Sequence, residues 1–521
     1  MKRSFLSIGV ALSAMLATTA CVDNSKSSLK HGVEGNHHEG EITPVINPEN
    51  LTYYKDIKPL FESKCVSCHI EGGLAPFELT EYAMVQGFRK SIKAAVVSRT
   101  MPPWSADAGH QSYKNDASLS ADELTMLVGW IDAGAKAGTE DQYVRSAAPA
   151  EFVSDIKIPV TQSPAGYLPV QERSDDYHCF IVPIGEEFKE TPYITGFTTI
   201  PGNAKIVHHL IGYYAAPQIV EYLKELDAEE PGEGYTCYGG ALPDRIGNPA
   251  VQAAIEARHP GALKLMQDNN HWVSQWAPGA NGFDFPADSG FKVEVGGAFV
   301  MQMHYYTADT KGEVDTNTIL GLKTAKTVAK PGFVYPLTNQ DWLQARKNNS
   351  MVIPANGTAT FATEQNLARI TGYGRHVLHM TPDQIIKNVE LHSTNLHMHA
   401  TGASGTVTFE KAVEDSNPET LLSIGAWDIH WQRDYTFAES KVIPAAAIQD
   451  YKLKVVCNYK NDRATDTFGG FGSMDEMCFN FSFFSFELEP AVVATPVATP
   501  AAEAPVATPF VEATATPAAA K

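Results

Sequence analysis

The sequence predicts a mainly β protein in which a small all-α domain precedes two tandem antiparallel β-sandwich domains. Between about residues 150 and 489, short runs alternate apolar with polar residues, as at 291–295 (FKVEV) and 405–409 (GTVTF), and Pro and Gly separate the runs. Such alternation is typical of strands with one buried face. The segment is about twice as long as one sandwich, so we expect two domains, at 150–330 and 331–489.

The length and charge of the chain limit its class. With 521 residues, the chain is too long for one hydrophobic core. Hydrophobic residues make up 44% and charged residues 19%, which is an ordinary balance for a globular protein. The formal net charge is -20 and the sequence has no basic run, so we expect no nucleic-acid partner.

The first residues predict export. A short basic region, residues 1–3 (MKR), precedes an apolar stretch of about a dozen residues, which is the pattern of a secretory signal and is too short to span a bilayer. Small residues at 18–20 (TTA) lead to Cys21, which resembles a bacterial lipoprotein cleavage site, although Leu is usual where Thr18 stands. We expect a signal peptide at 1–21 and lipidation of Cys21, with ordinary cleavage nearby as the alternative.

A lipidated Cys21 would anchor the protein to a membrane in the bacterial periplasm or at the cell surface. Val22 follows Cys21 where Asp would favour retention at the inner membrane, so we expect an outer-membrane lipoprotein. Residues 22–50 are polar and predict a flexible linker. Residues 490–521 repeat Ala-Thr-Pro and predict a disordered tail, to which we assign no chemistry.

Residues 51–145 are predicted to form the all-α domain. Ser120 followed three residues later by Glu123 is a capping box, which marks the start of a helix. Apolar residues then recur with helical spacing at Leu124, Leu127, Val128 and Ile131.

The most specific motif of this domain is C-x-x-C-H at Cys65, Cys68 and His69. In c-type haem attachment two thiols bond to the haem and the adjacent His reaches the iron, so the motif predicts one covalent haem c. A redox C-x-x-C or half of a zinc site are the rival interpretations. Neither requires the adjacent His, and the sequence contains no second C-x-x-C.

The haem iron needs a second axial ligand, for which we predict Met101. Met101 lies in residues 99–104 (RTMPPW), where two prolines fix the loop after it. Methionine ligation raises the reduction potential of haem, which suits electron transfer. His110 is the rival ligand, and a purely structural Met is the other alternative. The region at about 50–140 resembles small class I-type cytochrome c domains.

Three groups of histidines stand out in the β region. His397 and His399 are two residues apart on an apparent strand, so both side chains face one side and can share a metal ion. His208 and His209 are adjacent, so both reach one metal ion only at a strand end or a bulge. A single histidine such as His304 is more often structural.

The order of these groups becomes specific when residues 474–478 (MDEMC) are added. The series H-H, Q-x-H-Y, H-x-H and D-E-M-C, over about residues 165–489, resembles the copper type II, ascorbate-dependent monooxygenase family. The runs at 177–180 (YHCF) and 275–279 (QWAPG) add to the resemblance. It implies jelly-roll-like sandwiches that bind two copper ions, one in each sandwich.

The resemblance also implies the copper ligands. One ion is expected to bind three imidazoles, those of His208, His209 and His304. The second is expected to bind a catalytic set of two imidazoles and a thioether, those of His397, His399 and Met477. A thioether favours Cu(I), the form that binds dioxygen. Met474 is the alternative to Met477.

Four cysteines remain beside the lipid and haem assignments: Cys179, Cys237, Cys457 and Cys478. An exported protein with an even number of further cysteines is expected to form disulfides. The resemblance implies a Cys457–Cys478 bridge that holds the loop of Met477. The pairing of Cys179 with Cys237 then follows mainly by elimination.

At three positions the sequence departs from the peptidylglycine-hydroxylating members of the family. Those enzymes have an Arg that binds a substrate carboxylate two residues before H-x-H, and this chain has Asn395 there. After the Met-Cys pair it has Phe479 and Phe481 in place of Asn and Tyr. We therefore expect a small, uncharged or apolar substrate and no amidation of glycine-extended peptides.

The resemblance implies hydroxylation of an aliphatic C–H bond with dioxygen. The haem domain predicts electrons that enter at the haem, pass to the three-histidine copper and then reach the oxygen-binding copper. The sequence identifies neither the external electron donor nor any use of ascorbate. The alternatives are a non-enzymatic periplasmic electron-transfer or copper-handling lipoprotein, and β domains that bind sugar or protein and use the histidines only structurally.

Overall fold

The computed structural model describes most of the chain between residues 47 and 490. The positions left out within this range are 72–74, 76, 115, 146–151, 173–174, 238–240, 242–248, 277–281, 287, 308–309, 414–416, 430 and 471–473. The predicted signal peptide, the lipidation of Cys21, most of the linker at 22–50 and nearly all of the tail at 490–521 lie outside the described residues and stay predictions.

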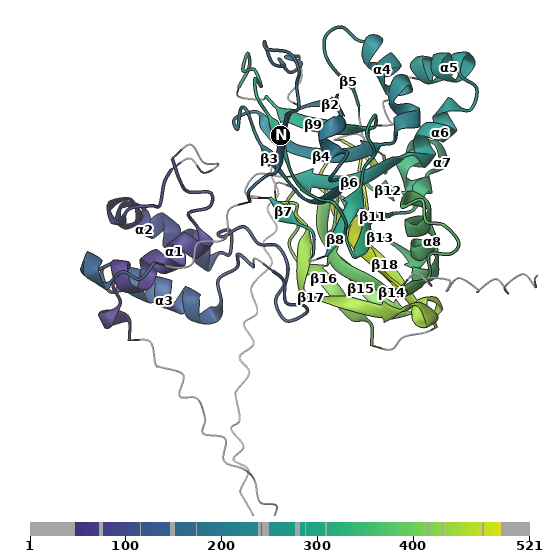
Figure 1. Cartoon of the computed structure of the whole chain (residues 1–521). Coiled ribbons are helices and arrows are strands. Elements are labelled where there is room, and N and C mark those ends of the chain that lie inside the picture. The colour runs from purple at the N-terminus through teal and green to yellow at the C-terminus, as the bar shows by residue number, and fades with distance from the viewer. Residues whose placement is uncertain are drawn as a thin grey trace, which may run out of the picture. The chain divides into compact units, whose positions relative to one another are not determined.

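Short helices form the N-terminal part of the described chain, where the sequence predicted an all-α domain (Figure 1). They are η1 (Pro48–Asn50), η2 (Tyr53–Ile57), α1 (Lys58–Lys64), α2 (Tyr82–Val97), α3 (Ala121–Asp132) and η3 (Glu140–Gln142). The predicted capping box of α3 is confirmed. The Glu123 N–H donates to Ser120 Oγ at 3.1 Å, and the Ser120 N–H donates to the Glu123 carboxylate at 2.8 Å.

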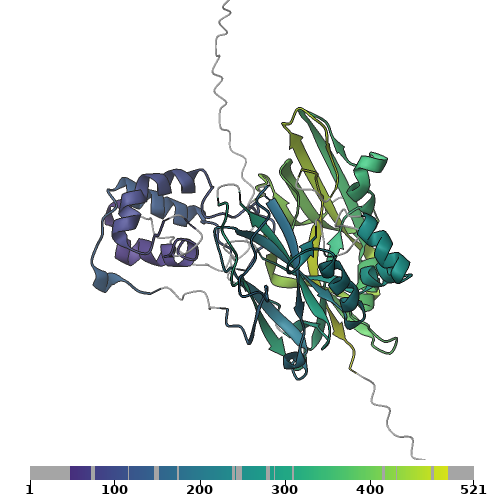
Figure 2. The ribbon, with the colours of Figure 1, turned by 90° about the horizontal axis from the view of Figure 1, so that it is seen from above.

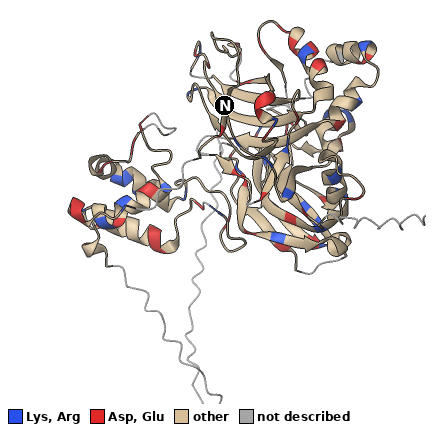
Figure 3. Ribbon diagram, in the orientation of Figure 1, with Lys and Arg blue, Asp and Glu red and all other residues tan. Residues whose placement is uncertain are grey.

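Along the helices of this region, Lys and Arg residues are interspersed with Asp and Glu residues (Figure 3). Lys93 of α2 pairs with Asp132 of α3 at 2.6 Å. Such exposed pairs contribute little to stability. Tyr53 and Trp130 are fully buried, with ring centroids 6.2 Å apart, so aromatic packing rather than ion pairing holds the helices together.

One layer of the N-terminal sandwich is a five-stranded sheet. Its order is β5 (Tyr235–Thr236), β2 (Asp175–Pro183), β9 (Ala298–Tyr306), β4 (Val207–Ala215) and β6 (Asn270–Trp276). Apolar residues such as Leu210, Met301 and Met303 are buried in one cluster with Phe197 and Leu320 of the other layer.

The other layer belongs to a nine-stranded sheet that runs through both sandwiches. Its order is β1 (Ile156–Pro159), β10 (Ile319–Ala325), β3 (Tyr193–Ile200), β8 (Ser289–Lys292), β11 (Lys330–Leu337), β20 (Asn480–Leu488), β14 (Ile386–Thr394) and β17 (Tyr435–Pro444), and β7 (Phe283–Asp284) pairs with β3. β8 and β11 pair in parallel, with Lys330 opposite Ser289. The prediction of purely antiparallel sandwiches is wrong at this pair, because local alternation identifies a strand but not its neighbours.

The C-terminal sandwich packs β11, β20, β14 and β17 on a four-stranded sheet. The order of that sheet is β13 (Gly357–Asn366), β18 (Tyr451–Asn461), β15 (Gly402–Lys411) and β16 (Glu419–Ile424). Leu391 and Phe484 from one layer share a buried core with Val407 and Val455 from the other. The short strands β12 (Val352–Ile353) and β19 (Thr467–Phe468) form a separate pair.

Helices α4, α5, α6 and α8 lie outside the strand layers (Figures 1 and 2). The helical elements of the β region are η4 (Glu186–Phe188), η5 (Pro217–Ile219), α4 (Val220–Ala228), α5 (Pro249–Arg258), α6 (Ala262–Asp268), η7 (Gln340–Gln344), α7 (Ala345–Asn348), α8 (Leu367–Val377) and η8 (Ala445–Asp450). The fold is mainly β, as the sequence predicted. Among the described residues, no helix combines the length and the apolar composition needed to cross a bilayer.

Both predicted disulfides are confirmed. Cys179 of β2 bonds to Cys237 with an S–S distance of 2.09 Å, and Cys457 of β18 bonds to Cys478 with a distance of 2.06 Å. All four residues are buried. The second bridge ties the residue after Met477 to an inner strand of the four-stranded sheet.

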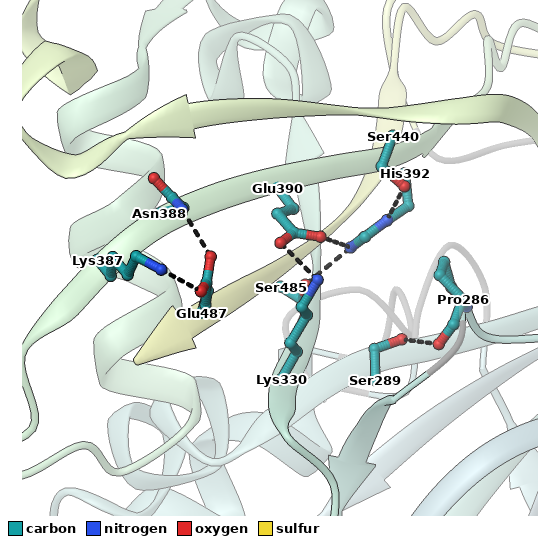
Figure 4. A network of polar contacts seen from close by, with 10 residues as sticks. All are labelled: Pro286, Ser289, Lys330, Lys387, Asn388, Glu390, His392, Ser440, Ser485 and Glu487. Carbon is teal, nitrogen blue, oxygen red and sulfur yellow. Dashed lines mark hydrogen bonds and ion pairs between the residues drawn. The ribbon is translucent and has the colours of Figure 1, made fainter. Parts of the chain in front are cut away.

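A buried polar network lies where the two sandwiches join (Figure 4). Lys330, the first residue of β11, pairs with Glu390 of β14 at 2.6 Å. His392 lies 2.5 Å from Ser440 Oγ and 2.7 Å from Ser485 Oγ, and burial lowers the pKa of His392 to about 3. The imidazole is therefore neutral at physiological pH and cross-links β14, β17 and β20.

Candidate metal centres

Three imidazoles from neighbouring strands converge in the N-terminal sandwich. His208 and His209 lie on β4, and His304 lies on β9, which is paired with β4. The Nδ1 atom of His208 lies 3.2 Å from that of His209 and 3.2 Å from that of His304. The Nδ1 atoms of His209 and His304 lie 3.1 Å apart. We call His208, His209 and His304 the three-histidine group.

A bulge brings the two adjacent histidines to one side of β4. The register with β9 shifts between Val207, which is opposite Tyr305, and His209, which is opposite His304. His208 is the extra residue, so strand alternation does not force its side chain to the face opposite His209. This is the irregularity that the sequence required for an adjacent pair to share one metal ion.

Neighbouring side chains fix the ring of His304. Tyr177 of β2 stacks on it, with ring centroids 4.2 Å apart and 2° between the ring planes. His304 Nε2 lies 2.9 Å from Asp175 Oδ1, and this hydrogen bond lowers the pKa of Asp175. An ionised Asp175 accepts the Nε2–H, which leaves the lone pair on Nδ1 facing the other two imidazoles.

The three-histidine group fits a metal ion. Burial lowers the pKa values of His209 and His304, which favours neutral imidazoles with available lone pairs. A nitrogen triangle with sides of 3.1 and 3.2 Å admits an ion about 2 Å from each corner, the usual metal–imidazole distance. Imidazole ligands suit copper among the first-row metals.

The second group comes from irregular segments of the C-terminal sandwich. His397 and His399 follow β14, which ends at Thr394, and their ring centroids lie 5.2 Å apart. His397 keeps an isolated antiparallel bridge to Phe479. The prediction that both histidines lie on a regular strand is wrong, because the ladder of β14 stops before them. Met398 between them is fully buried in the core of the C-terminal sandwich.

We group Met477 with His397 and His399 as the histidine–methionine group, because Glu476 accepts the backbone N–H groups of both His399 and Met477. The Met477 side chain is only 7% exposed. Met474, the alternative from the sequence, is 63% exposed and is therefore less suited to a buried site.

Hydrogen bonds orient both imidazoles of the histidine–methionine group. His397 Nδ1 lies 2.6 Å from Gln432 Oε1, and His399 Nδ1 lies 2.9 Å from the Asp475 carbonyl oxygen. Both acceptors require the proton on Nδ1, so the Nε2 lone pairs are available to a metal ion. Burial lowers the pKa of His397 to about 3, which favours the neutral form.

A buried carboxylate holds the two segments of this group together. Glu476 is fully buried and accepts the backbone N–H of His399 at 2.9 Å and that of Met477 at 3.3 Å. It also accepts the N–H and the hydroxyl of Thr401, at 2.6 and 2.8 Å. The sequence did not predict this role, and the one available signal was the position of Glu476 directly before Met477.

Aromatic rings from both sandwiches lie beside the histidine–methionine group. The rings of Phe479 and Phe481 stack at 5.3 Å, and Trp272 of β6 stacks on Phe481 at 3.9 Å. The His397 ring lies 6.4 Å from each phenylalanine ring. Two of the three departures from peptidylglycine enzymes therefore form an apolar surface that shares a cluster with Met477.

Asn395, the remaining departure, is tied to an acid. Its Nδ2 donates to Asp434 Oδ1 at 3.0 Å, and Nε2 of Gln275 on β6 donates to the same oxygen at 2.7 Å. Asn395 Oδ1 accepts the Phe481 N–H at 3.0 Å. Burial raises the pKa of Asp434 to about 6. Asp434 thus links the two sandwiches beside the histidine–methionine group, and no sequence motif pointed to it.

The C-x-x-C-H residues lie just after α1. Cys65 and Cys68 are half-buried thiols, and the His69 N–H donates to the Cys65 carbonyl at 3.1 Å, within one turn. His69 Nδ1 lies 2.9 Å from the Phe77 carbonyl oxygen, so its Nε2 lone pair is available to iron. Met101 follows α2 and is 36% exposed. These residues fit a covalent haem.

Comparison with known proteins identifies relatives of the β region. The chain matches the copper type II ascorbate-dependent monooxygenase N-terminal domain over residues 164–312 and the C-terminal domain of the same family over residues 348–498, together more than half of its length. Dopamine beta-hydroxylase of Homo sapiens is 23% identical over 348 residues, which are 64% of this chain and 46% of that protein. The chain thus spans about half the length of this curated relative.

Solved structures give only faint similarity. The VP2 subviral particle of infectious bursal disease virus has a TM-score of 0.15 and 10% identity, over 65% of this chain and 74% of the other. The major capsid protein P2 of bacteriophage PM2 has a TM-score of 0.19 and 8% identity, over 64% and 98%. Scores this low carry no argument about the fold or the function.

Proposed function

The chain belongs to the copper type II ascorbate-dependent monooxygenase family, and from this premise we propose that it is an exported haem-copper monooxygenase. It hydroxylates an aliphatic C–H bond of a small, uncharged substrate with dioxygen. One oxygen atom enters the substrate and the other leaves as water, so each turnover consumes two electrons and two protons. The observation that carries the proposal is the presence of two unlike metal-ligand sets, one in each sandwich.

The three-histidine group and the histidine–methionine group are proposed to have different roles in the reaction. Bound copper supplies a one-electron redox change at each group and dioxygen binding where a thioether favours Cu(I). The three-histidine group would hold a copper ion through its Nδ1 atoms, and Asp175 fixes the tautomer of His304 that leaves Nδ1 free for this role. The histidine–methionine group would hold a copper ion through its Nε2 atoms and the Met477 thioether, while hydrogen bonds to Glu476 hold the two segments together.

The aromatic residues beside the histidine–methionine group support the proposal of an apolar substrate. Phe481 and Trp272 lie beside the histidine–methionine group, where they exclude water and favour a hydrocarbon. Asn395 occupies the position of the cation in peptidylglycine enzymes and is held by Asp434, so a substrate carboxylate finds no positive charge at this position. An acidic substrate is therefore expected to react more slowly than its neutral amide.

We further propose that electrons enter through a haem c bound by Cys65, Cys68, His69 and Met101. The support is the C-x-x-C-H motif and the hydrogen bond that leaves His69 Nε2 available. Two disulfides and the N-terminal signal support export to the periplasm or the cell surface. Cys21 supports a lipid anchor, with the outer membrane as the proposed location.

Stopped-flow mixing tests the proposal on the full-length, haem-containing protein. The reduced, copper-loaded protein is mixed with dioxygen and a panel of neutral apolar compounds, while haem absorbance and hydroxylated product are followed. We expect haem oxidation that requires copper, with product formed in step. Haem oxidation at the same rate without copper would reject transfer from haem to copper.

The variant Met477→Ala separates this proposal from a non-enzymatic electron-transfer or copper-handling lipoprotein. Without the thioether, product formation is expected to be lost, whereas the haem still exchanges electrons with an external donor. A wild-type protein that oxidises its haem in the presence of copper but never couples oxygen uptake to product is the electron-transfer lipoprotein instead.

A further inference from the structure

A segment that we call the strap, residues 104–114, leaves the helical region and crosses the C-terminal sandwich. On β16, the Asp107 N–H donates to the Ser423 carbonyl at 2.8 Å, and the Ser423 hydroxyl donates to the Asp107 carboxylate at 2.6 Å. Tyr113 is 9% exposed, and its hydroxyl donates to the Leu421 carbonyl at 2.8 Å. The strap is therefore anchored to the last strand of the four-stranded sheet.

The strap also pairs with β17, the last strand in the order of the nine-stranded sheet. The Ala438 N–H donates to the Ser112 carbonyl at 2.8 Å. The Lys114 N–H donates to the Thr436 carbonyl, also at 2.8 Å. Because β16 and β17 are edge strands, the strap covers backbone groups of both layers and fixes the helical region to the C-terminal sandwich.

Trp104, the first residue of the strap, lies three residues after Met101 and packs on Tyr435. The two rings meet edge to face, with centroids 5.1 Å apart and 81° between the planes. The Arg433 guanidinium lies 5.4 Å from the Trp104 ring centroid. Tyr435 is 2% exposed and directly follows Asp434. Contacts thus run without interruption from the Met101 loop to Asp434.

From Asp434, one hydrogen bond leads toward the histidine–methionine group and another leads toward the three-histidine group. Asn395, hydrogen-bonded to Asp434 at 3.0 Å, is two residues before His397 in the chain. Gln275, hydrogen-bonded at 2.7 Å, lies opposite Ile211 of β4, so one more strand pairing separates Gln275 from the strand of the three-histidine group. The route to the histidine–methionine group therefore has one non-covalent step fewer.

We propose that Trp104, Tyr435, Asp434 and Asn395 form the electron path from the helical region to the copper module, and that the histidine–methionine group is its first acceptor. The inference rests on the proposed haem and copper. One electron leaves ferrous haem, which becomes ferric, and reduces Cu(II) to Cu(I), with no bond made or broken. This order reverses the sequence-based hypothesis, in which the three-histidine copper was reduced first. The physical reason is that transfer slows steeply with each through-space step, and the strap rests on the C-terminal sandwich.

Two substitutions at position 104 test the path in the full-length, copper-loaded protein. Trp104→Leu removes the ring but keeps apolar volume, whereas Trp104→Phe keeps a ring on Tyr435. We expect Trp104→Leu to slow copper-dependent haem oxidation severalfold and Trp104→Phe to slow it much less. Tyr373→Leu is the matched control, because Tyr373 meets Tyr335 edge to face at 5.2 Å in a pair that belongs to α8 and β11. It is expected to leave the rate unchanged.

Hydrogen exchange at the Ala438 amide separates a broken path from an undocked strap, because this N–H is bonded to the strap. Slowed haem oxidation with Ala438 still protected supports the path. An unchanged rate in Trp104→Leu overturns it, and so does a slowed rate that appears only together with loss of Ala438 protection. Haem oxidation that never depends on copper, even in the wild-type protein, would instead reject the proposed function.

Single-site variants test the order of the acceptors. His208→Ala disables the three-histidine group and is expected to keep the first phase of haem oxidation. His397→Ala disables the histidine–methionine group and is expected to lose that phase, with electron paramagnetic resonance showing the remaining copper still oxidised. The reverse pattern would overturn the proposed order.

Discussion

The three-histidine group and the histidine–methionine group are built by different means. In the first, the ligands sit on two paired strands, and one bulge at His208 sets the geometry. In the second, the ladder has already ended, and a buried carboxylate and single hydrogen bonds hold two loops together, while a disulfide ties the Met477 loop to β18. A group carried by strands shares the stability of its sheet, whereas a group carried by loops depends on a few side chains.

The largest expected effect contrasts the disulfides of the two sandwiches. Replacing Cys179 and Cys237 with Ser opens a loop of 58 residues and is expected to lower the free energy of unfolding by about 4 kcal/mol. Replacing Cys457 and Cys478 opens 21 residues and is expected to cost about 3 kcal/mol. Guanidinium unfolding of the two double variants measures both values.

Copper titration of the same variants sharpens the contrast. The Cys457/Cys478 variant is expected to weaken copper binding at the histidine–methionine group, because the bridge follows Met477 directly. The Cys179/Cys237 variant is expected to leave that group intact. If both variants weaken copper binding equally at both metal groups, the stability of the two groups is coupled. The proposed difference between them would then be wrong.

The next effect concerns Glu476. Glu476→Ala leaves the buried N–H groups of His399, Thr401 and Met477 without their acceptor and is expected to cost about 3 kcal/mol. Cu(I) affinity at the histidine–methionine group should fall with it, whereas the three-histidine group should bind as before.

Two controls accompany this measurement. Glu476→Gln keeps an acceptor oxygen and should recover part of both losses. Glu364→Ala removes an exposed partner of Lys452 and is expected to change stability by less than about 1 kcal/mol. If Glu476→Ala behaves like Glu364→Ala, the carboxylate does not hold the loops.

A smaller effect is expected at the three-histidine group. Asp175→Ala removes the acceptor of the His304 Nε2–H and should weaken copper binding there by about tenfold. The loss is expected at the low end of the usual range, because the Asp175 side chain is 39% exposed and water can replace it. Tyr177→Phe keeps the ring stacked on His304 and serves as the control. Competition titration with a copper chelator measures both, and an unchanged affinity in Asp175→Ala counts against the assigned tautomer.

The sequence predicted the features that nearby residues decide. The adjacent pair His208-His209 required a bulge, and β4 has one. The capping box needed only Ser120 and Glu123. The mainly β class followed from alternation along single strands.

Apart from the disulfides and the metal-ligand groups, for which the family resemblance and elimination supplied the partners, contacts that join distant segments were not predicted, because no local pattern contains both partners. Glu476 and His399 are 77 residues apart, Gln275 and Asp434 are 159 apart, and the contact of Tyr113 with Leu421 spans 308. The H-x-H motif alternates like a strand, but its segment keeps only the single bridge of His397, because the β14 ladder ends at Thr394. Tertiary contacts thus decided what alternation alone had assigned to a regular strand.

A pH-dependent test concerns Asp434, the group that both sandwiches share. Burial raises its pKa to about 6, so between pH 4 and 6 Asp434 keeps its proton in the folded protein but loses it in the unfolded chain, and the contribution of Asp434 to stability falls as the pH rises through this window. Asp434→Asn keeps an acceptor for Gln275 and Asn395 but removes the buried charge. The variant should therefore be about 3 kcal/mol more stable than the wild type at pH 7 and equal to it below pH 4. Urea unfolding at pH 4, 5 and 7 measures this difference. A pH dependence as steep in the variant as in the wild type would mean that other groups cause it. Burial of the Asp434 charge would then not destabilise the folded protein.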